Sequence, residues 1–362
     1  MNDPRVHERL CHIGLTDAIE QTLPPLRGDE LNHRTRLMRV AEVQREGLAL
    51  HDGDTLHSAR LLPLLRQTLA ASNDAIAVGD WVLAHGDEFG QWWAHDRLPP
   101  RNQLARRLTD GRDKVTRAVI VSNVDTALLV MGLDHDHSLR RLERFVALVQ
   151  MAGVTPVVVL SKADCVPDPA PRVAEVQRLL PPQASVVAVN ALHPSAADAL
   201  SPWLQPGRTL VLLGSSGAGK STLTNTLVGQ AVADTGANRS SDSRGRHTTT
   251  ARTLHLTPSG ACIVDTPGLR TLRLDADATA IGSAFSDVAE QAGSCRFRDC
   301  RHADEPGCAV RGKVSDERLK NYNKLLRETE RDSLTALQRK QQVQQWKARG
   351  RLARLRLEAK RG

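Results

Sequence analysis

A glycine-rich loop is the feature of the sequence whose chemistry is clearest. The apolar run 210–213 leads into a stretch typical of a phosphate loop: Gly214, Ser215, Ser216, Gly217, Ala218, Gly219, Lys220, Ser221 and Thr222. In this motif the glycines let backbone N–H groups curl around phosphates at a helix N-terminus, while the lysine reaches the β and γ phosphates. The serine after the lysine can ligate Mg²⁺. We therefore predict a site for a nucleoside triphosphate with Mg²⁺, between a strand and a helix.

A second segment downstream can sense the terminal phosphate. Asp265 and Gly268 belong to the sequence DTPG, which follows the apolar run 261–264. We expect Asp265 to hold the water shell of Mg²⁺ and the Gly268 N–H to contact the γ-phosphate, as in a second switch loop. Leu269 stands where a Ras-like enzyme carries its water-positioning glutamine, so another group must orient the water.

The polar stretch 240–252 lies between these segments and predicts a mobile first switch loop. Such a loop needs one threonine that ligates Mg²⁺ and touches the γ-phosphate, and Thr249 and Thr250 are both candidates. His247 is the nearest candidate for orienting the attacking water, although a surface histidine fits the sequence equally well. Together with Lys220, these residues form the predicted catalytic set.

The residues that would read the base lie upstream of the phosphate loop. Ser161, Lys162 and Asp164 follow the apolar run 157–160, at the carboxyl end of a predicted strand, where ligands bind in open α/β sheets. The Asp164 carboxylate can accept hydrogen bonds from guanine N1–H and N2–H₂, while the Lys162 stem covers the ring. This motif predicts that the nucleotide is GTP or GDP.

A further predicted strand, 186–189, leads to Asn190 and Ala191, where a backbone N–H could meet guanine O6. Both base-reading segments thus precede the phosphate loop, whereas ordinary GTPases begin with it. The order predicts a circularly permuted GTPase whose switch loops come directly before the C-terminal part of the chain.

Three cysteines and a histidine cluster near the C-terminus. Cys295, Cys300, His302 and Cys308 offer three thiolates and one imidazole, a closed tetrahedral set suited to one structural Zn²⁺. Because the chain otherwise has the character of a cytosolic protein, the spacing favours a metal over disulfides.

Patterning divides the chain into four parts. Residues 1–35 carry scattered charge and predict a flexible N-terminal arm. Residues 36–112 contain short alternating apolar pieces between turns, which favour a small all-β barrel; an OB barrel, an SH3-like barrel or a sandwich all fit. In residues 113–275, β-branched runs alternate with helical stretches, which predicts a parallel α/β sheet. Residues 276–362 combine the cysteine cluster with a mainly helical, basic end.

Charge and hydropathy limit the partners. The net charge is +8, and nine lysines and arginines in residues 338–362 face a single glutamate, Glu358, so this tail fits nucleic acid better than a merely solvated helix face. No apolar run approaches the length that spans a bilayer, and the first ten residues lack the apolar region of a signal peptide. We expect a cytoplasmic protein with no membrane partner.

The combination of motifs resembles the RsgA (YjeQ) family of bacterial circularly permuted GTPases. The resemblance runs from about residue 36 to 326 and is carried by Arg101-Asn102, Asn123-Val124-Asp125, the segments 161–164, 214–221, 247–250 and 265–268, and the Cys3His set. It implies an N-terminal OB barrel, a zinc-binding C-terminal domain, and late maturation of the small (30S) ribosomal subunit through contact with its rRNA. It also implies that the subunit stimulates GTP hydrolysis.

Two positions depart from the family pattern. Ser161 stands where Asn or Thr is usual, and Asn190 where Ser is usual. Two other functions compete with the one that the resemblance implies: a permuted GTPase acting on the large subunit, and an rRNA-binding module with little intrinsic turnover. Whichever of these functions holds, we expect the protein to be a monomer.

Overall fold

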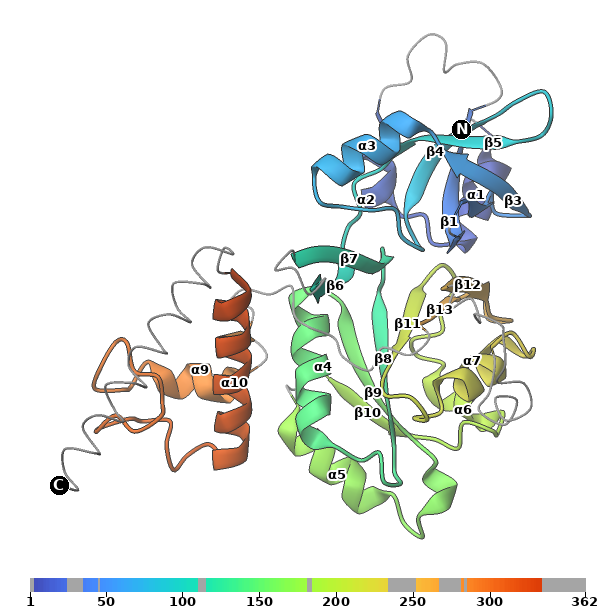
Figure 1. Ribbon diagram of the computed structural model, residues 1–362. Coiled ribbons are helices and arrows are strands. Elements are labelled where there is room, and N and C mark those ends of the chain that lie inside the picture. The colour runs from blue at the N-terminus through green and yellow to red at the C-terminus, as the bar shows by residue number, and fades with distance from the viewer. Residues whose placement is uncertain are drawn as a thin grey trace, which may run out of the picture. The chain divides into compact units, whose positions relative to one another are not determined.

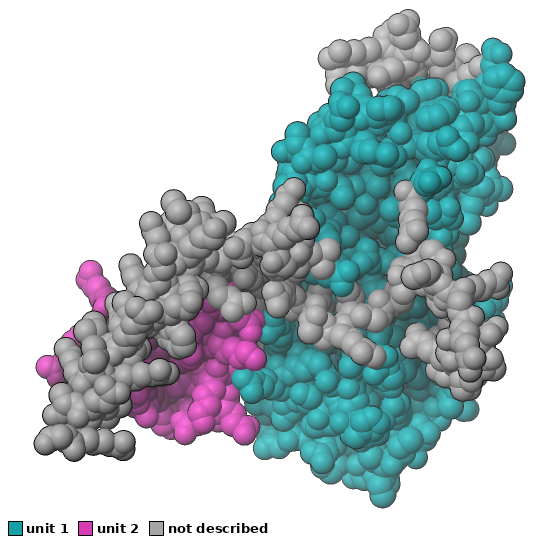
Figure 2. All heavy atoms as spheres, viewed as in Figure 1, with its two compact units in different colours: residues 1–106, 117–273 teal, residues 107–116, 274–362 magenta. Residues whose placement is uncertain are grey.

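The structure is a computed structural model. It describes residues 3–24, 35–44, 46–109, 115–180, 184–233, 252–266, 281–282 and 285–333. The chain forms two compact units, residues 1–106 with 117–273 and residues 107–116 with 274–362 (Figure 2). Within the described parts of the chain, no helix is both long enough and apolar enough to cross a membrane.

The N-terminal segment is folded, so the prediction of a flexible arm over residues 1–35 is wrong for residues 3–24. Two helices, α1 (Pro4–His12) and α2 (Asp17–Glu20), and the turn between them bury a set of apolar side chains: Leu10, Ile13, Leu15 and Ile19. Asp3 caps α1 by accepting the Arg5 N–H at 2.9 Å. The pattern was missed because the four apolar residues are divided between two short helices and a turn.

Five strands close into a barrel after these helices. They are β1 (Thr35–Val43), β2 (Leu48–His51), β3 (Leu56–Leu61), β4 (Trp81–Gly86) and β5 (Trp92–Arg97). The pairing order β1-β2-β3-β5-β4 returns to β1, and α3 (Pro63–Ala71) lies between the third and fourth strands in sequence. This is the arrangement of an OB barrel. Its core contains Met38, Val40, Leu50, Val82 and Ala94.

An α/β sheet follows the barrel. Its strands are β8 (Thr126–Gly132), β9 (Thr155–Ser161), β10 (Ser185–Ala188), β11 (Thr209–Leu213), β12 (Thr253–Leu256) and β13 (Cys262–Asp265). They run in the order β10-β9-β8-β11-β13-β12, and all neighbours are parallel except β12 and β13. A separate two-stranded sheet, β6 (Gln103–Thr109) with β7 (Val115–Ser122), precedes β8.

Helices cover both faces of this sheet. The helices α4 (Leu139–Met151) and α5 (Ala170–Leu179) lie on one side, and α6 (Ser195–Leu200) and α7 (Lys220–Val228) on the other (Figure 1). The α4 helix turns an apolar stripe toward β8 and β9, which includes Leu142, Phe145, Val146 and Val149. The strands β8, β9, β11 and β13 are buried almost throughout, which explains their near-continuous apolar sequences.

The barrel and the α/β sheet are joined within the first unit. Strand β1 pairs with β12 at Glu42 and Thr253, which produces one sheet of eleven strands. The buried Arg39 side chain of β1 donates hydrogen bonds to three carbonyl oxygens, those of Ile13, Gly79 and Asn123. These acceptors come from the N-terminal helices, the barrel and the α/β part, so a single guanidinium connects all three.

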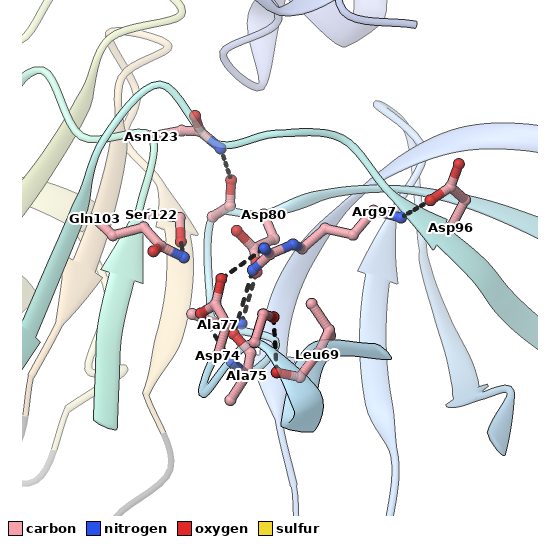
Figure 3. Close-up of polar contacts among 12 residues, drawn as sticks. Leu69, Asp74, Ala75, Ala77, Asp80, Asp96, Arg97, Gln103, Ser122 and Asn123 are labelled. Atoms are coloured by element: carbon pink, nitrogen blue, oxygen red, sulfur yellow. Dashed lines mark hydrogen bonds and ion pairs between the residues drawn. The ribbon is translucent and has the colours of Figure 1, made fainter. Parts of the chain in front are cut away.

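A second, largely buried polar cluster lies where β5 ends, beside the segment between α3 and β4 (Figure 3). Arg97 of β5 places Nη2 2.7 Å from Asp74 Oδ2 and Nη1 3.6 Å from Asp80 Oδ2. Asp80 also accepts the Ala77 N–H at 2.8 Å. Complete burial raises the pKa of Asp80 to about 6, and the nearby Arg97 charge only partly opposes this shift.

The second unit contains α9 (Ser286–Ala292), α10 (Asp316–Ser333) and the cysteine-rich loop between them. Its small core contains Phe285, Val288, Val310, Leu319 and Leu325. Arg318 of α10 binds the Asp287 carboxylate of α9 at 2.6 and 2.8 Å. The basic tail, residues 338–362, lies outside the described residues.

Candidate guanine-nucleotide site and metal-binding cluster

The phosphate loop connects β11 to α7, as the sequence predicted. Gly214 and Gly219 have φ values of 153° and 91°, and a Cβ at Gly214 would lie 2.2 Å from the Val130 carbonyl oxygen. Only glycine therefore fits this close approach to β8. Lys220, the first residue of α7, is 7% exposed, and its Nζ donates to the carbonyl oxygens of Gly214 at 3.0 Å and Ser215 at 2.6 Å.

The base motif contacts the phosphate loop directly. Ser161, the fully buried last residue of β9, donates its hydroxyl hydrogen bond to the Ala218 carbonyl oxygen at 2.6 Å. A serine hydroxyl thus connects these two segments at a position where the family usually has Asn or Thr. Asp164 follows in a short 3-10 turn, Ala163–Cys165, with its side chain exposed at the carboxyl end of the sheet. An exposed carboxylate in this place can accept hydrogen bonds from an incoming base.

The turn after β10 is tied to α7. The Ala191 carbonyl oxygen accepts the Thr226 hydroxyl at 2.6 Å, and Asn190 Oδ1 accepts the Leu192 N–H at 2.9 Å. Asn190 therefore caps its own turn through the side chain, as a serine hydroxyl also can. The Val189 carbonyl oxygen accepts the Ala163 N–H at 3.2 Å, so both predicted base-reading segments are held together.

Asp265 provides a test of whether the residues suit Mg²⁺. It ends β13 beside Leu212 of β11, and its buried Oδ1 has no hydrogen-bond partner among the described residues. Burial raises the pKa of Asp265, while the Lys220 charge lowers it. A buried carboxylate oxygen without a donor is a group that a cation would satisfy, and carboxylate and hydroxyl oxygens are ligands that Mg²⁺ prefers. Asp265, with the Ser221 hydroxyl as the second predicted ligand, therefore fits the ion.

Several predicted site residues lie outside the described parts of the chain. His247, Thr249 and Thr250 fall in residues 234–251, and Gly268 falls in residues 267–280. Their roles stay predictions.

Two aspartates that contact residues of the candidate site were missed by the sequence reasoning. Asp134 and Asp136 follow β8 and contact Lys162 and Ser215, respectively, each at 2.6 Å. The available signal was two carboxylates directly after a buried strand, at the carboxyl edge where ligands bind.

The four predicted metal ligands of the second unit do come together. The ligand atoms of Cys295, Cys300, His302 and Cys308 all lie within 4.8 Å of one another. His302 Nδ1 lies 3.6 Å from the Cys295 sulfur and 3.5 Å from the Cys308 sulfur. The donor set could therefore hold a metal ion.

Backbone contacts shape the loop around this cluster. The Glu305 carboxylate accepts the N–H groups of Arg301 at 3.2 Å and Ala303 at 2.9 Å, and the Ala309 N–H donates to the Cys295 sulfur at 3.3 Å. Burial and the neighbouring thiols raise the pKa of Cys300 to about 11. Without a bound cation, the three sulfurs would therefore not all ionise near neutral pH.

A phosphate loop that follows its base motif in sequence, on a parallel sheet entered from a five-stranded barrel, defines a circularly permuted GTPase. Residues 98–275 match the RsgA GTPase family. A Xanthomonas axonopodis protein, "Small ribosomal subunit biogenesis GTPase RsgA", is 44% identical over 293 residues, which cover 79% of each chain. A Vibrio vulnificus protein, "Small ribosomal subunit biogenesis GTPase RsgA 2", is 43% identical over 275 residues, 75% of this chain and 77% of that one. The chain belongs to the RsgA GTPase family and is a GTP hydrolase.

Solved structures are similar in fold. YjeQ from Thermotoga maritima matches 82% of this chain and 98% of its own, with a TM-score of 0.59 and 24% identity. YloQ, a circularly permuted GTPase, matches 84% of this chain and 98% of its own, with a TM-score of 0.56 and 22% identity. The predicted fold class is confirmed, including the N-terminal barrel, the permuted order and the Cys3His cluster.

Proposed function

We propose that this GTPase binds the small (30S) ribosomal subunit, assists its late maturation, and hydrolyses GTP to GDP and phosphate when the subunit stimulates it. The relatives named for small-subunit biogenesis support the partner. The hydrogen bond from Ser161 to Ala218 carries the nucleotide assignment, because it joins the base motif and the phosphate loop into one site.

In the proposed site, the chain's own groups bind and orient GTP. Asp164 accepts the guanine N1–H and N2–H₂ groups, the Lys162 stem covers the ring, and the Ala191 N–H meets O6. The phosphate-loop N–H groups, with Lys220, surround the phosphates. Because these donors are in position before the reaction begins, they would stabilise the negative charge that develops on the phosphate oxygens during phosphoryl transfer.

The proposed magnesium ligands are Ser221, Asp265 through water, and Thr249 or Thr250. When bound, Mg²⁺ neutralises negative charge on the phosphate oxygens. The Gly268 N–H would detect the γ-phosphate, and His247 would orient the attacking water.

For the second unit we propose one structural Zn²⁺ held by the Cys3His set. Three sulfurs and one imidazole close a tetrahedral shell without an open position for catalysis. We also propose domain bounds of 36–112 for the barrel, 113–275 for the GTPase and 276–362 for the zinc-binding domain with its basic tail. A cytoplasmic monomer without a membrane partner completes the proposal.

The test is GTP turnover of the full chain, measured alone and with separately purified 30S and 50S subunits. We expect stimulation and co-sedimentation with 30S only. Stimulation by and co-sedimentation with 50S instead of 30S would favour a large-subunit factor. GTP binding without turnover under any of these conditions would instead favour an rRNA-binding module.

A further inference from the structure

The loop between β8 and α4, residues 133–138, touches both halves of the nucleotide site. Its two carboxylates point to different segments: Asp134 lies 2.6 Å from the Lys162 ammonium, and Asp136 contacts the Ser215 hydroxyl. None of the predicted nucleotide-site residues belongs to this loop.

The Asp136 carboxylate is fixed by contacts with Ser215 and Arg141. Both of its carboxylate oxygens lie 2.6 Å from Ser215 Oγ, its side chain is 10% exposed, and Arg141 Nη2 lies 2.5 Å from Oδ1. The Ser215 carbonyl oxygen in turn accepts the Lys220 Nζ at 2.6 Å. A continuous series of contacts therefore runs from Arg141 through Asp136 and the phosphate loop to Lys220.

Asp134 holds the other lysine. Lys162 has a left-handed backbone, with φ of 58°, and its Nζ ends on Asp134 Oδ2. Burial would raise the pKa of Asp134, but its hydrogen bonds to Lys162 and to the Asp136 N–H lower it below the ordinary value. The carboxylate is therefore charged at neutral pH. With the ammonium fixed in this way, the methylene stem is held in one position.

We propose that residues 133–138 form a nucleotide-positioning loop, in which Asp136 positions the phosphate loop through Ser215 and Asp134 positions the base-covering Lys162. The inference rests on the proposed assignment of Lys162 and the phosphate loop to guanine-nucleotide binding. Neither aspartate touches the reacting atoms, so both act through another residue.

The experiment measures steady-state GTP hydrolysis and GDP affinity for the full-length protein. Asp134→Ala should raise the GDP dissociation constant and KM about tenfold, because an ionic hydrogen bond is lost, and kcat should change much less. Asp136→Ala and Ser215→Ala should each lower kcat as well, because Lys220 loses its fixed position beside the γ-phosphate. The Asp136→Ala/Ser215→Ala double variant should lose no more kcat than the more impaired of the two single variants, because both substitutions remove the same contact.

Asp198→Ala is the matched control. Asp198 is an exposed aspartate of α6, outside the positioning loop, so KM and kcat should stay within twofold of the parent. Asp136→Asn keeps an acceptor for the Ser215 hydroxyl and should recover most of the turnover, which keeps the test valid if Asp136→Ala does not fold.

Additive effects of the Asp136 and Ser215 substitutions would overturn the proposal, as would an Asp134→Ala variant with unchanged GDP affinity. Equal losses in Asp136→Asn and Asp136→Ala would also count against it. A parent protein that binds no guanine nucleotide would instead refute the proposed function, so the two failures are distinguishable.

Discussion

Removing the Ser161 hydroxyl tests how the base motif and the phosphate loop depend on each other. Ser161 and Ala218 are both fully buried, and the 2.6 Å hydrogen bond between them has no water available to replace it. Ser161→Ala leaves the buried Ala218 carbonyl oxygen without a hydrogen-bond donor, which costs about 1 to 3 kcal/mol of free energy. Because Ala218 lies between two phosphate-loop glycines, part of that loss should appear as weaker binding.

We expect the GDP dissociation constant of Ser161→Ala to rise on the order of tenfold, equivalent to about 1.4 kcal/mol. Fluorescent GDP titration gives the affinity, and thermal unfolding without nucleotide gives the share of the loss that is structural. Ser161→Thr keeps the hydroxyl and should bind within a few-fold of the parent. Ser185→Ala, at the amino end of β10, removes a serine hydroxyl at the opposite edge of the sheet and should leave GDP affinity unchanged.

An unchanged GDP affinity in Ser161→Ala, with an intact fold, would refute the reasoning. The contact would then be a packing detail of β9, and the two segments would form the site independently. A loss of equal size in Ser185→Ala would point to general destabilisation of the sheet.

Four further predictions concern other parts of the chain. Metal analysis should find about one equivalent of Zn²⁺, and Cys300→Ser should lose it and become protease-sensitive in the second unit; a variant with unchanged resistance would contradict the structural role. Deleting residues 338–362 should weaken rRNA binding and reduce the slope of log affinity against log salt by about 0.7 to 0.9 per lost phosphate contact, whereas an unaltered slope would mean a solvated tail. Asp164→Asn should weaken GTP binding by about one to two decades and improve XTP binding, because the amide donates to the xanthine carbonyl; no gain for XTP would exclude Asp164 as the base reader. Finally, burial raises the pKa of Asp80 from its ordinary value of 3.8 to about 6. The unfolded chain therefore loses this proton at a lower pH than the folded protein, and the free energy of unfolding should fall by about 3 kcal/mol in total as the pH rises from about 4 to 6. Urea unfolding should therefore show Asp80→Asn gaining stability relative to the parent across this range, and a constant difference would contradict the assignment.

Local sequence patterns were sufficient for the parts of the site that lie on one segment. The phosphate loop, the prediction of Asp164 as the base reader and the Cys3His set all depend on spacing within a single loop or turn, which can be read directly from the sequence. The alternation of apolar runs with helical stretches also gave the α/β sheet. An all-β barrel followed from patterning as well, but the OB type depended on the family resemblance, because strand order is not written in alternation.

Contacts between distant segments could not be found in this way. The Asp136 carboxylate meets a hydroxyl 79 residues away, and the Arg39 guanidinium reaches a carbonyl 84 residues away. Neither partner differs in type from many other polar residues, so only the packing of strands identifies the pair. The same holds for the first helices, whose few apolar residues are buried only through contacts with parts of the chain that are distant in sequence.

The permuted chain can form the same kind of nucleotide site as an ordinary GTPase. The site depends on which strands are neighbours in the sheet and not on the order of the strands along the chain. In the parallel pairs of the sheet, Gly132 lies opposite Ser161, and Leu212 lies opposite both Leu128 and Asp265. The loop carrying Asp134 and Asp136, the base motif, the phosphate loop and Asp265 therefore all leave the sheet at one edge.

Strand β12 connects the barrel to the strand that carries Asp265. It begins at Thr253, directly after the stretch predicted as the first switch loop, and pairs on one side with β13, which carries Asp265, and on the other with β1 of the barrel. A shift of β12 would have to be accommodated by hydrogen bonds on both sides. Strand β1 of the barrel and Asp265, the residue proposed to hold the Mg²⁺ water shell, are therefore both connected to β12, although they lie more than 200 residues apart in the sequence.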